Sequence, residues 1–181
     1  MIEHAEAKRG QLLAAVESIA VPLGFHPASI MVQAELESGR FKKIIGLNNY
    51  WGIKVPKSIP WTGTTARVIT SETFTDPAEF VKFVNKHIAD ILSIGYNEKQ
   101  KLWWVKLWDV FCDWPFEPAA VEYYTALVKR LYPVAYALRH DPPRYFTALV
   151  SGKRKWATDI VYAQSLIDLW NQLRPAYERQ G

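Results

Sequence analysis

The feature that most constrains this fold is the recurrence of apolar residues every three or four positions, in short segments that proline or glycine ends. Residues 4–20 show this spacing, and Pro22 and Gly24 then interrupt it. Pro27 suits the first turn of a second helix, and Gly39 suits its left-handed stop. The pattern predicts a mainly α-helical chain of short helices.

One segment departs from this spacing and indicates a small β element. Residues 61–75 are rich in Thr, Val and Ile, which predicts a β-hairpin. Asp76 and Pro77 then provide a cap and a first turn for a helix that we expect to run to Gly95. The remaining helices are expected over 99–139 as a pair, over 143–150 and over 158–173.

Length and composition place the chain in one domain. It has 181 residues, of which 49% are hydrophobic and 22% charged, as in ordinary globular domains. No linker, repeat or low-complexity segment divides it, so residues 1–181 are expected to form a single domain. The longest uncharged stretch, 18–34, contains two prolines and a glycine, which excludes a membrane-spanning helix.

Several kinds of chemistry are excluded by residues that the chain lacks. Its single cysteine, Cys112, permits no intrachain disulfide and no cysteine-rich zinc site. The four histidines lie far apart without ligand spacing, so we expect no metal and no cofactor. The net charge of +4 is scattered rather than gathered in a basic stripe, which argues against a nucleic-acid partner.

The acidic end of the second helix is the strongest candidate for chemistry. Helical spacing from Ile30 and Ala34 puts Glu37 on or beside the buried face. Glu35 projects elsewhere, and we expect it to be solvated. The negative end of the helix dipole and partial burial both favour the protonated carboxyl, which is the form that a general acid needs. The alternative is an ordinary helix-end glutamate paired with Arg40.

The turn that follows has the composition of a carbohydrate site. It runs from Asn48 and Asn49 through Tyr50 and Trp51, so two amides stand beside two aromatic rings. Rings stack on sugar faces, and amides bond hydroxyl and acetamido groups. We therefore expect these four residues to bind a glycan.

A second carboxylate follows in the expected hairpin. Glu72 lies in the same segment as Trp61, which we add to the substrate-binding residues. A second carboxylate across a cleft from a proton donor is the arrangement of glycoside hydrolysis. Considered alone, Glu72 is an ordinary exposed strand residue, and that interpretation stays open.

Taken in order, these elements resemble the glucosaminidase family of peptidoglycan hydrolases, which is glycoside hydrolase family 73 of the lysozyme-like superfamily and includes flagellar muramidase-like domains. The resemblance covers about residues 10–95 and 140–175. The motifs that carry it are Gln33-Ala34-x-Leu36-Glu37-Ser38-Gly39, Asn48-Asn49-x-x-Gly52-Ile53-Lys54, Trp61-Thr62-Gly63, Thr70-Ser71-Glu72, and Ala157-Thr158-Asp159 followed by Tyr162-Ala163.

The resemblance implies a lysozyme-like helical domain with a small β-hairpin lobe and an open groove for the glycan strand. It makes Glu37 the general acid. It makes Glu72 the second carboxylate, which activates water or stabilises the oxocarbenium-like transition state. It also places Tyr162 beside them as the third catalytic residue, and it adds Trp156 and Asp159 to the substrate-binding residues.

The chain departs from the family pattern at three places. Trp156 stands where the family usually has tyrosine, and Ile160 stands where it has proline. The hairpin segment is short, so Asp76 or Glu79 is an alternative second acid. Residues 96–140 look like a helical insertion, whose row of aromatic residues is either a packed core face or a surface that stacks on sugars.

These features predict an endo-β-N-acetylglucosaminidase that hydrolyses the β-1,4 bond of peptidoglycan as a monomer, without membrane insertion. Muramidase or lytic transglycosylase chemistry is the first alternative, and a glycan-binding or structural module with little activity is the second. The substrate lies outside the bacterial cytoplasm, in the periplasm or beyond the cell. Because the first residues lack the apolar region of a secretory signal, we expect release by a phage or export by a route other than Sec.

Overall fold

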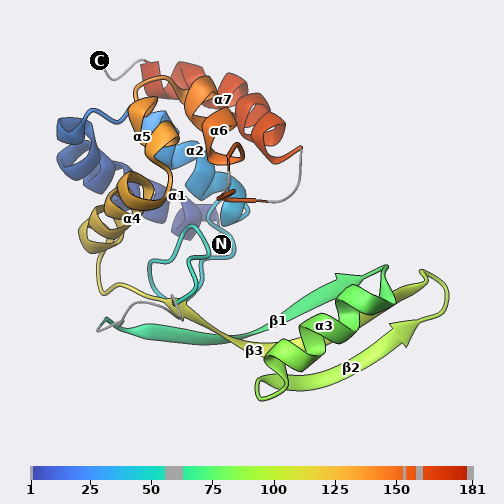
Figure 1. Cartoon of the computed structure of the whole chain (residues 1–181). Helices are drawn as coiled ribbons and strands as arrows, with labels where there is room; N and C mark the ends of the chain where they lie inside the picture. The colour runs from blue at the N-terminus through green and yellow to red at the C-terminus, as the bar shows by residue number, and fades with distance from the viewer. Residues whose placement is uncertain (1, 56–62, 153, 158–160, 179–181) are drawn as a thin grey trace. The chain divides into compact units, whose positions relative to one another are not determined.

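The chain forms two compact units in the computed structural model (Figure 1). The structure describes residues 2–55, 63–152, 154–157 and 161–178. The helical unit contains residues 1–52 and 113–181, and the sheet unit contains residues 53–112.

The helical unit is built around α2, which spans Pro27–Glu37. The side chain of His26 accepts a hydrogen bond from the backbone N of Ala28 at 3.1 Å, and Pro27 lies in the first turn, so the predicted start of this helix is confirmed. All residues over 28–35 are buried, the polar Ser29, Gln33 and Glu35 included, because other helices surround this part of α2. α2 is therefore a fixed platform for the residues at its carboxyl end.

The other helices of this unit pack around α2. α1 (Ile2–Ala15) continues into a π-helical turn (Val16–Ala20) and a 3₁₀ turn (Val21–Leu23), in place of the single helix expected over 4–20. The later helices are α4 (Glu117–Leu131), α5 (Pro133–Ala137), α6 (Pro142–Leu149) and α7 (Tyr162–Glu178). The mainly α-helical class is confirmed. Within the described residues, no helix is long and apolar enough to cross a bilayer.

The sheet unit is an antiparallel sheet with one helix packed on it. Among the described residues its strands are β1 (Thr65–Phe74), β2 (Ile91–Asn97) and β3 (Leu102–Cys112), in the order β1-β3-β2. α3 (Pro77–His87) lies between β1 and β2 in the chain and against the sheet (Figure 1). Its Phe80 packs against Val105 and Leu107 on one face of the sheet. Around this core lie Phe74, Phe83, Val84, Ile91 and Trp103.

Two sequence predictions for this part of the chain are wrong. Residues 65–74 form one strand rather than a hairpin, because their partner is the distant strand β3, which pairs Phe74 with Trp103. The helix that begins at Pro77 ends at His87 instead of Gly95, and the chain then enters β2.

The row of aromatic residues over 103–111 lies on β3 and not on a helix. Val105 and Leu107 are buried and Lys106 between them is exposed, which is the alternation of a strand. The predicted pair of helices over 96–140 is therefore wrong in its first half, whereas α4 confirms the second. That 96–140 is an insertion relative to compact family members stays a prediction.

Candidate active site

Glu37 is the last residue of α2, and the residues after it close the helix with a left-handed turn. The Oγ of Ser38 donates to the carbonyl oxygen of Ala34 at 2.6 Å and accepts from the backbone N of Phe41 at 2.9 Å. Residues 39–41 have φ angles of 57°, 59° and 62°. Gly39 enters this region without strain, and the Ser38 hydroxyl supports the residues that follow. These contacts thus fix the end of α2 and the position of Glu37 there.

Two side chains donate to one oxygen of Glu37. Nε1 of Trp156 lies 3.0 Å from Oε1, and the hydroxyl of Tyr162 lies 2.6 Å from the same oxygen. The sequence motifs therefore place all three residues at one site of the helical unit. The expected partial burial of Glu37 is corrected, because its side chain is exposed beyond the buried part of α2.

The alternative partner of Glu37, Arg40, is engaged elsewhere. Its Nη2 donates to Oε1 of Gln172 at 3.5 Å. In the part of the chain that the structure describes, Glu37 forms no ion pair. Its carboxyl is therefore held by neutral donors rather than by a cation.

Tyr162 is the first residue of α7, and it remains a protonated donor. Burial raises the pKa of its hydroxyl above the usual value, and the charge of Glu37 raises it further. Its oxygen accepts a hydrogen bond from Nε2 of Gln33 at 3.2 Å. Tyr162 therefore supplies a hydrogen bond to Glu37 and does not act as a base at physiological pH.

Trp156 is fixed through its backbone and its ring. Its backbone N donates to the carbonyl oxygen of Leu149 at 2.8 Å. Its ring lies 5.7 Å from the ring of Tyr124 and 5.5 Å from the ring of Tyr132, in tilted arrangements. The indole N–H is thereby aimed at Glu37.

The expectation that Glu35 is solvated is wrong, because its side chain is buried. Its side chain is 2% exposed and accepts from Nε of Arg9 at 2.8 Å and from the hydroxyl of Tyr177 at 3.1 Å. Arg9 lies on α1 and Tyr177 on α7, and both helices contact α2. Because α2 is surrounded, its polar residues lie inside as well, and this carboxylate needs its cation.

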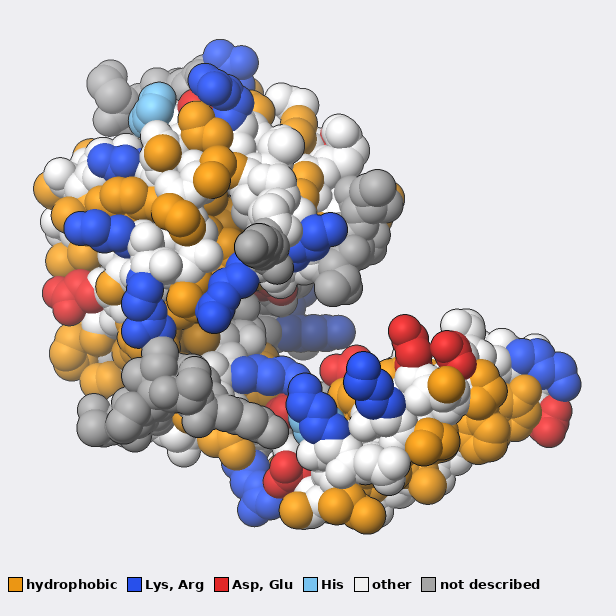
Figure 2. All heavy atoms as spheres, in the orientation of Figure 1, with side chains coloured by type: hydrophobic (Ala, Val, Ile, Leu, Met, Phe, Trp, Pro, Cys, Tyr) orange, Lys and Arg blue, Asp and Glu red, His pale blue; other side chains and the backbone are white. Residues whose placement is uncertain are grey.

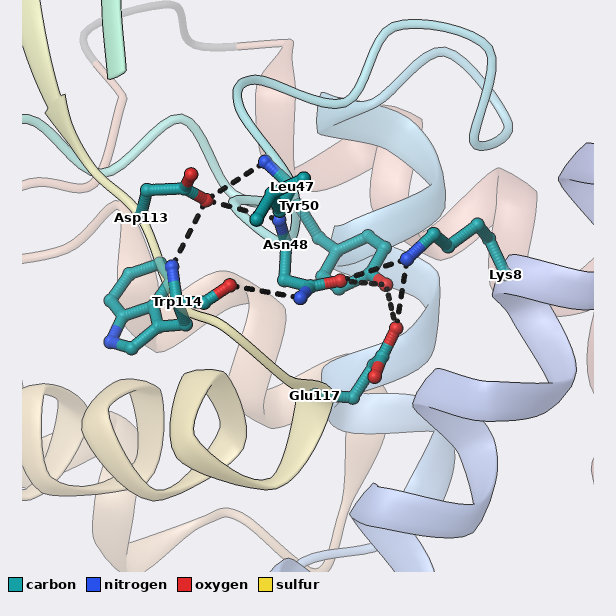
Figure 3. Close-up of polar contacts among 7 residues, drawn as sticks. All are labelled: Lys8, Leu47, Asn48, Tyr50, Asp113, Trp114 and Glu117. Atoms are coloured by element: carbon teal, nitrogen blue, oxygen red, sulfur yellow. Dashed lines mark hydrogen bonds and ion pairs between the residues drawn. The ribbon is translucent and has the colours of Figure 1, made fainter. Parts of the chain in front are cut away.

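Asp113 holds the start of the turn that follows α2 (Figure 3). Its Oδ1 accepts from the backbone N of Leu47 at 2.9 Å, of Asn48 at 3.1 Å and of Trp114 at 3.0 Å. Gly46 has a φ of 63°, and a Cβ there would lie 2.6 Å from the Asp113 carboxylate. Glycine is required at this position by both the backbone and the contact.

The side chains expected to bind sugar in this turn are bonded to the protein instead. Nδ2 of Asn48 donates to the carbonyl oxygen of Trp114 at 2.9 Å, and its Oδ1 accepts from Lys8 at 3.0 Å and from Tyr50 at 3.1 Å. Lys8 also donates to Glu117 at 3.0 Å, and the hydroxyl of Tyr50 shares its single proton between Asn48 and Glu117, whose Oε1 lies 3.1 Å away (Figure 3).

All four residues of this turn that were expected to bind sugar are buried. Asn48, Asn49, Tyr50 and Trp51 are each at most 2% exposed, and the ring of Trp51 stacks on that of Tyr124 with centroids 4.3 Å apart. We therefore interpret them as a scaffold beneath the site, in place of the sugar contacts that we expected. Amides and rings in a turn fill a core as readily as they face a ligand, so composition alone did not separate the two roles.

The second carboxylate candidate, Glu72, belongs to the sheet unit. It lies on β1 opposite Val105, half-exposed, and on the sheet face that α3 covers, as its neighbour Phe74 shows by contacting Phe80. Of the alternatives, Asp76 caps α3 by accepting from the backbone N of Ala78 at 2.8 Å. Glu79 lies exposed in the first turn of the same helix, where an acidic side chain favours the helix start.

Two predicted binding residues, Trp61 and Asp159, lie outside the described residues. In contrast, Tyr124, Tyr132 and Tyr145 were not singled out by the sequence. They are spread over α4, its end and α6, and no local motif joins them to Glu37. Only the packing of the helices brings them to this site.

Comparison with solved structures supports the mainly α-helical fold with a small sheet, and the similar structures include a glycoside hydrolase domain, an autolysin catalytic domain and a peptidoglycan hydrolase. The glycoside hydrolase domain of FlgJ from Salmonella typhimurium aligns with a TM-score of 0.63 and 21% identity, over 97% of this chain and 91% of that chain. The catalytic domain of the autolysin Auto from Listeria monocytogenes gives a TM-score of 0.58 and 17% identity, over 97% and 85%.

A peptidoglycan hydrolase from Sphingomonas sp. A1 gives a TM-score of 0.58 and 22% identity, over 95% of this chain and 90% of that chain. No protein-family model matches the sequence, and no curated protein matches it significantly. At these identities the comparisons establish the shared fold.

Proposed function

We propose that this protein hydrolyses the β-1,4 bond of the peptidoglycan glycan strand as an endo-β-N-acetylglucosaminidase, with Glu37 as the general acid. The observation that carries the proposal is the convergence of Trp156 and Tyr162 on one oxygen of Glu37, at 3.0 Å and 2.6 Å. The fold shared with peptidoglycan hydrolases supports the choice of substrate. Positive side chains are interspersed with hydrophobic and uncharged groups on the visible face of the helical unit (Figure 2), which suits an extended anionic polymer.

The two donors determine which oxygen of Glu37 carries the catalytic proton. Oε1 accepts both hydrogen bonds, so the proton of the neutral carboxyl belongs on Oε2, which has no partner among the described residues. In the acid step this proton passes to the glycosidic oxygen as the bond from that oxygen to the anomeric carbon breaks. The leaving sugar departs as an alcohol, and Glu37 is left as a carboxylate that Trp156 and Tyr162 stabilise.

Water completes the reaction at the anomeric carbon. Its oxygen bonds to that carbon, and its proton passes to a carboxylate, for which we propose Glu72 of the sheet unit. For substrate binding we retain Trp156, Trp61 and Asp159. The turn over 48–51 serves as the scaffold described above. The site of action that follows from this substrate is the bacterial cell wall.

One observation favours a second candidate within the same superfamily. In the helical unit, the described neighbours of Glu37 are a phenol and an indole rather than another carboxylate. A lytic transglycosylase needs a single glutamate, which gives its proton to the leaving glycosidic oxygen and then takes the proton of a muramyl hydroxyl as that hydroxyl oxygen bonds to the anomeric carbon of the same sugar. The two reactions give different ends, a free reducing sugar or an anhydro-muramyl sugar.

The test is product analysis of purified protein on insoluble peptidoglycan, by mass spectrometry of the released fragments. We expect reducing N-acetylglucosamine ends from the wild type and a rate lower by about 10²-fold or more from Glu37→Gln. Glu17→Gln, at an exposed position of the same unit, is the matched control and is expected to retain the wild-type rate. Anhydro-muramyl ends in the products would show that the reaction is transglycosylation rather than hydrolysis. If the wild type releases no fragments, the proposal is overturned.

A further inference from the structure

A continuous chain of hydrogen bonds runs from the core of the helical unit to Glu37. The hydroxyls of Tyr145 and Tyr124 are 2.6 Å apart, and Tyr124 also hydrogen-bonds to Oε1 of Gln33. Nε2 of Gln33 lies 3.2 Å from the hydroxyl of Tyr162, which lies 2.6 Å from Oε1 of Glu37. The chain joins α6, α4, α2 and α7, in that order.

The acceptor at the end of this chain determines the direction of every hydrogen bond in it. Oε1 of Glu37 can only accept, so Tyr162 must donate its single proton there. The oxygen of Tyr162 must then accept from Gln33, which requires the amide N–H of Gln33 on that side. The amide oxygen of Gln33 consequently faces Tyr124.

The same reasoning continues into the core. Tyr124 must donate to the amide oxygen of Gln33, so its own oxygen accepts from Tyr145. A flipped Gln33 amide would set its oxygen against Tyr162, whose only proton already goes to Glu37. The contact with Tyr162 would then be lost, even though Tyr124 could accept from the amide N–H by donating to Tyr145 instead, so one arrangement alone satisfies all the groups.

Burial prevents water from replacing the three inner members of the chain. Gln33, Tyr124 and Tyr145 are each 0% exposed. Burial also raises the pKa of the Tyr124 and Tyr145 hydroxyls, so both stay protonated. An unmade hydrogen bond at such a place costs the full desolvation of the group, which keeps the chain intact.

On the basis of the proposed function, we propose that Gln33 is a positioning residue for the general acid. Its amide N–H occupies the oxygen of Tyr162 and thereby obliges that hydroxyl to donate to Glu37. Tyr124 completes the arrangement by donating to the amide oxygen of Gln33, and Tyr145 donates to Tyr124. The Tyr162 hydroxyl is therefore held as a donor to Oε1 of Glu37, and Oε2 is the oxygen that delivers the proton.

A double-mutant cycle tests whether Gln33 acts through Tyr162. Gln33→Met keeps the length of the side chain and removes the amide, and we expect kcat to fall about 5- to 10-fold with little change in KM. Tyr162→Phe is expected to lower kcat at least as much. In the double variant the two losses should not multiply, because Gln33 has nothing left to position. Losses that do multiply would overturn the proposal.

The pH–rate profile of Gln33→Glu separates positioning from a merely structural role. The introduced carboxyl has nearly the same shape, and in its protonated form it can donate to Tyr162 as the amide does. When it ionises, it can only accept, and Tyr162 loses its donor. We therefore expect activity near that of the wild type at acidic pH and an alkaline limb displaced to lower pH. A profile that is scaled down equally at all pH values would contradict the inference.

Tyr145→Phe keeps the test informative if the variants at Gln33 are unstable. Tyr145 lies farthest from Glu37 in the chain, and its loss leaves the Tyr124 donation to Gln33 in place, so we expect less than a 3-fold change in kcat. A loss of about 5-fold or more would overturn the order of the chain. Failure of this inference is distinct from failure of the proposed function, because the latter would appear as full activity of Glu37→Gln.

Discussion

At position 156 an indole stands where the family pattern has a phenol, and its N–H donates to Glu37 at 3.0 Å. A phenol can donate, accept or ionise, whereas an indole N–H only donates. Trp156 therefore offers Glu37 the same hydrogen bond at every pH. Together with the Tyr162 hydroxyl, it gives the carboxylate that forms after proton transfer two donors on one oxygen.

This chemistry predicts that Trp156→Phe slows catalysis without unfolding the protein. Phenylalanine keeps an aromatic ring against Tyr124 and Tyr132 but removes the donor. The loss of one hydrogen bond to a charged group lowers kcat by about 10-fold. The measurement is kcat on peptidoglycan, with the melting temperature recorded in parallel. Tyr132→Phe keeps its ring and serves as the control near the wild-type rate; an equal loss in the two variants would contradict the role of the indole N–H.

At the scale of the element, the turn after α2 depends on Asp113, whose Oδ1 accepts from three backbone N–H groups. The close approach of Gly46 to this carboxylate predicts a large cost for Gly46→Ala. The added Cβ would lie 2.6 Å from the carboxylate. The alanine backbone would also have to adopt a φ of 63°, which is strained for a residue with a side chain. We expect a loss of about 2–4 kcal/mol in the free energy of unfolding, measured with urea.

Gly152→Ala is the matched control for this prediction. Gly152 also has a positive φ, 86°, but among the described residues no atom lies within 4 Å of an added Cβ. It should therefore lose only the backbone component, about 1 kcal/mol. If the two substitutions cost the same, contact with Asp113 does not determine the turn.

Glu117, the first residue of α4, is hydrogen-bonded to Lys8 and Tyr50 beside the same turn, and this carboxyl makes the stability of the fold depend on pH. Burial alone would raise the pKa of Glu117, but hydrogen bonds from Lys8 and from backbone outweigh it, so the pKa is lowered. A carboxyl with a lowered pKa stabilises the fold above its unfolded pKa, and this contribution disappears as the pH falls through the folded value. The stability advantage of the wild type over Glu117→Gln should thus be complete at pH 7 and lost progressively below about pH 4.

Urea unfolding at pH 7 and at pH 3 measures this advantage. Glu122→Gln, on an exposed position of the same helix, controls for the loss of a charge and should differ little from the wild type at both values. An advantage over Glu117→Gln that persists unchanged at pH 3 would argue that Lys8 and Tyr50 do not favour the ionised carboxyl.

The elements also show where sequence reasoning succeeds. α2 was predicted closely because local signals, Pro27 and Gly39, mark its ends. The strand β3 was missed because its apolar residues fit a helical stripe as well as an alternation, and only pairing with β1 decides between them. The burial of Glu35 depends on α1 and α7 packing around α2, which no pattern within α2 contains.

At the scale of the whole molecule, the chain crosses from one unit to the other twice, at 52–53 and at 112–113. The turn with Gly46 and Asp113 lies in the helical unit, next to both crossings in the sequence. The proposed acid belongs to the helical unit and the proposed second carboxylate to the sheet unit. Hydrolysis by the proposed route therefore requires both units, whereas single-glutamate chemistry requires the carboxyl of the helical unit alone.

Substitution of the second carboxylate distinguishes these routes. If Glu72 accepts the proton of water, Glu72→Gln lowers kcat by about 10²-fold and leaves the few remaining products with reducing ends. Asp76→Asn keeps a good helix cap and Glu79→Gln keeps an exposed side chain, so both are controls that fold normally and test the alternative acids. A large loss in either control would transfer the role to that residue. Full activity in all three variants, with anhydro ends in the products, would assign the reaction to Glu37 alone.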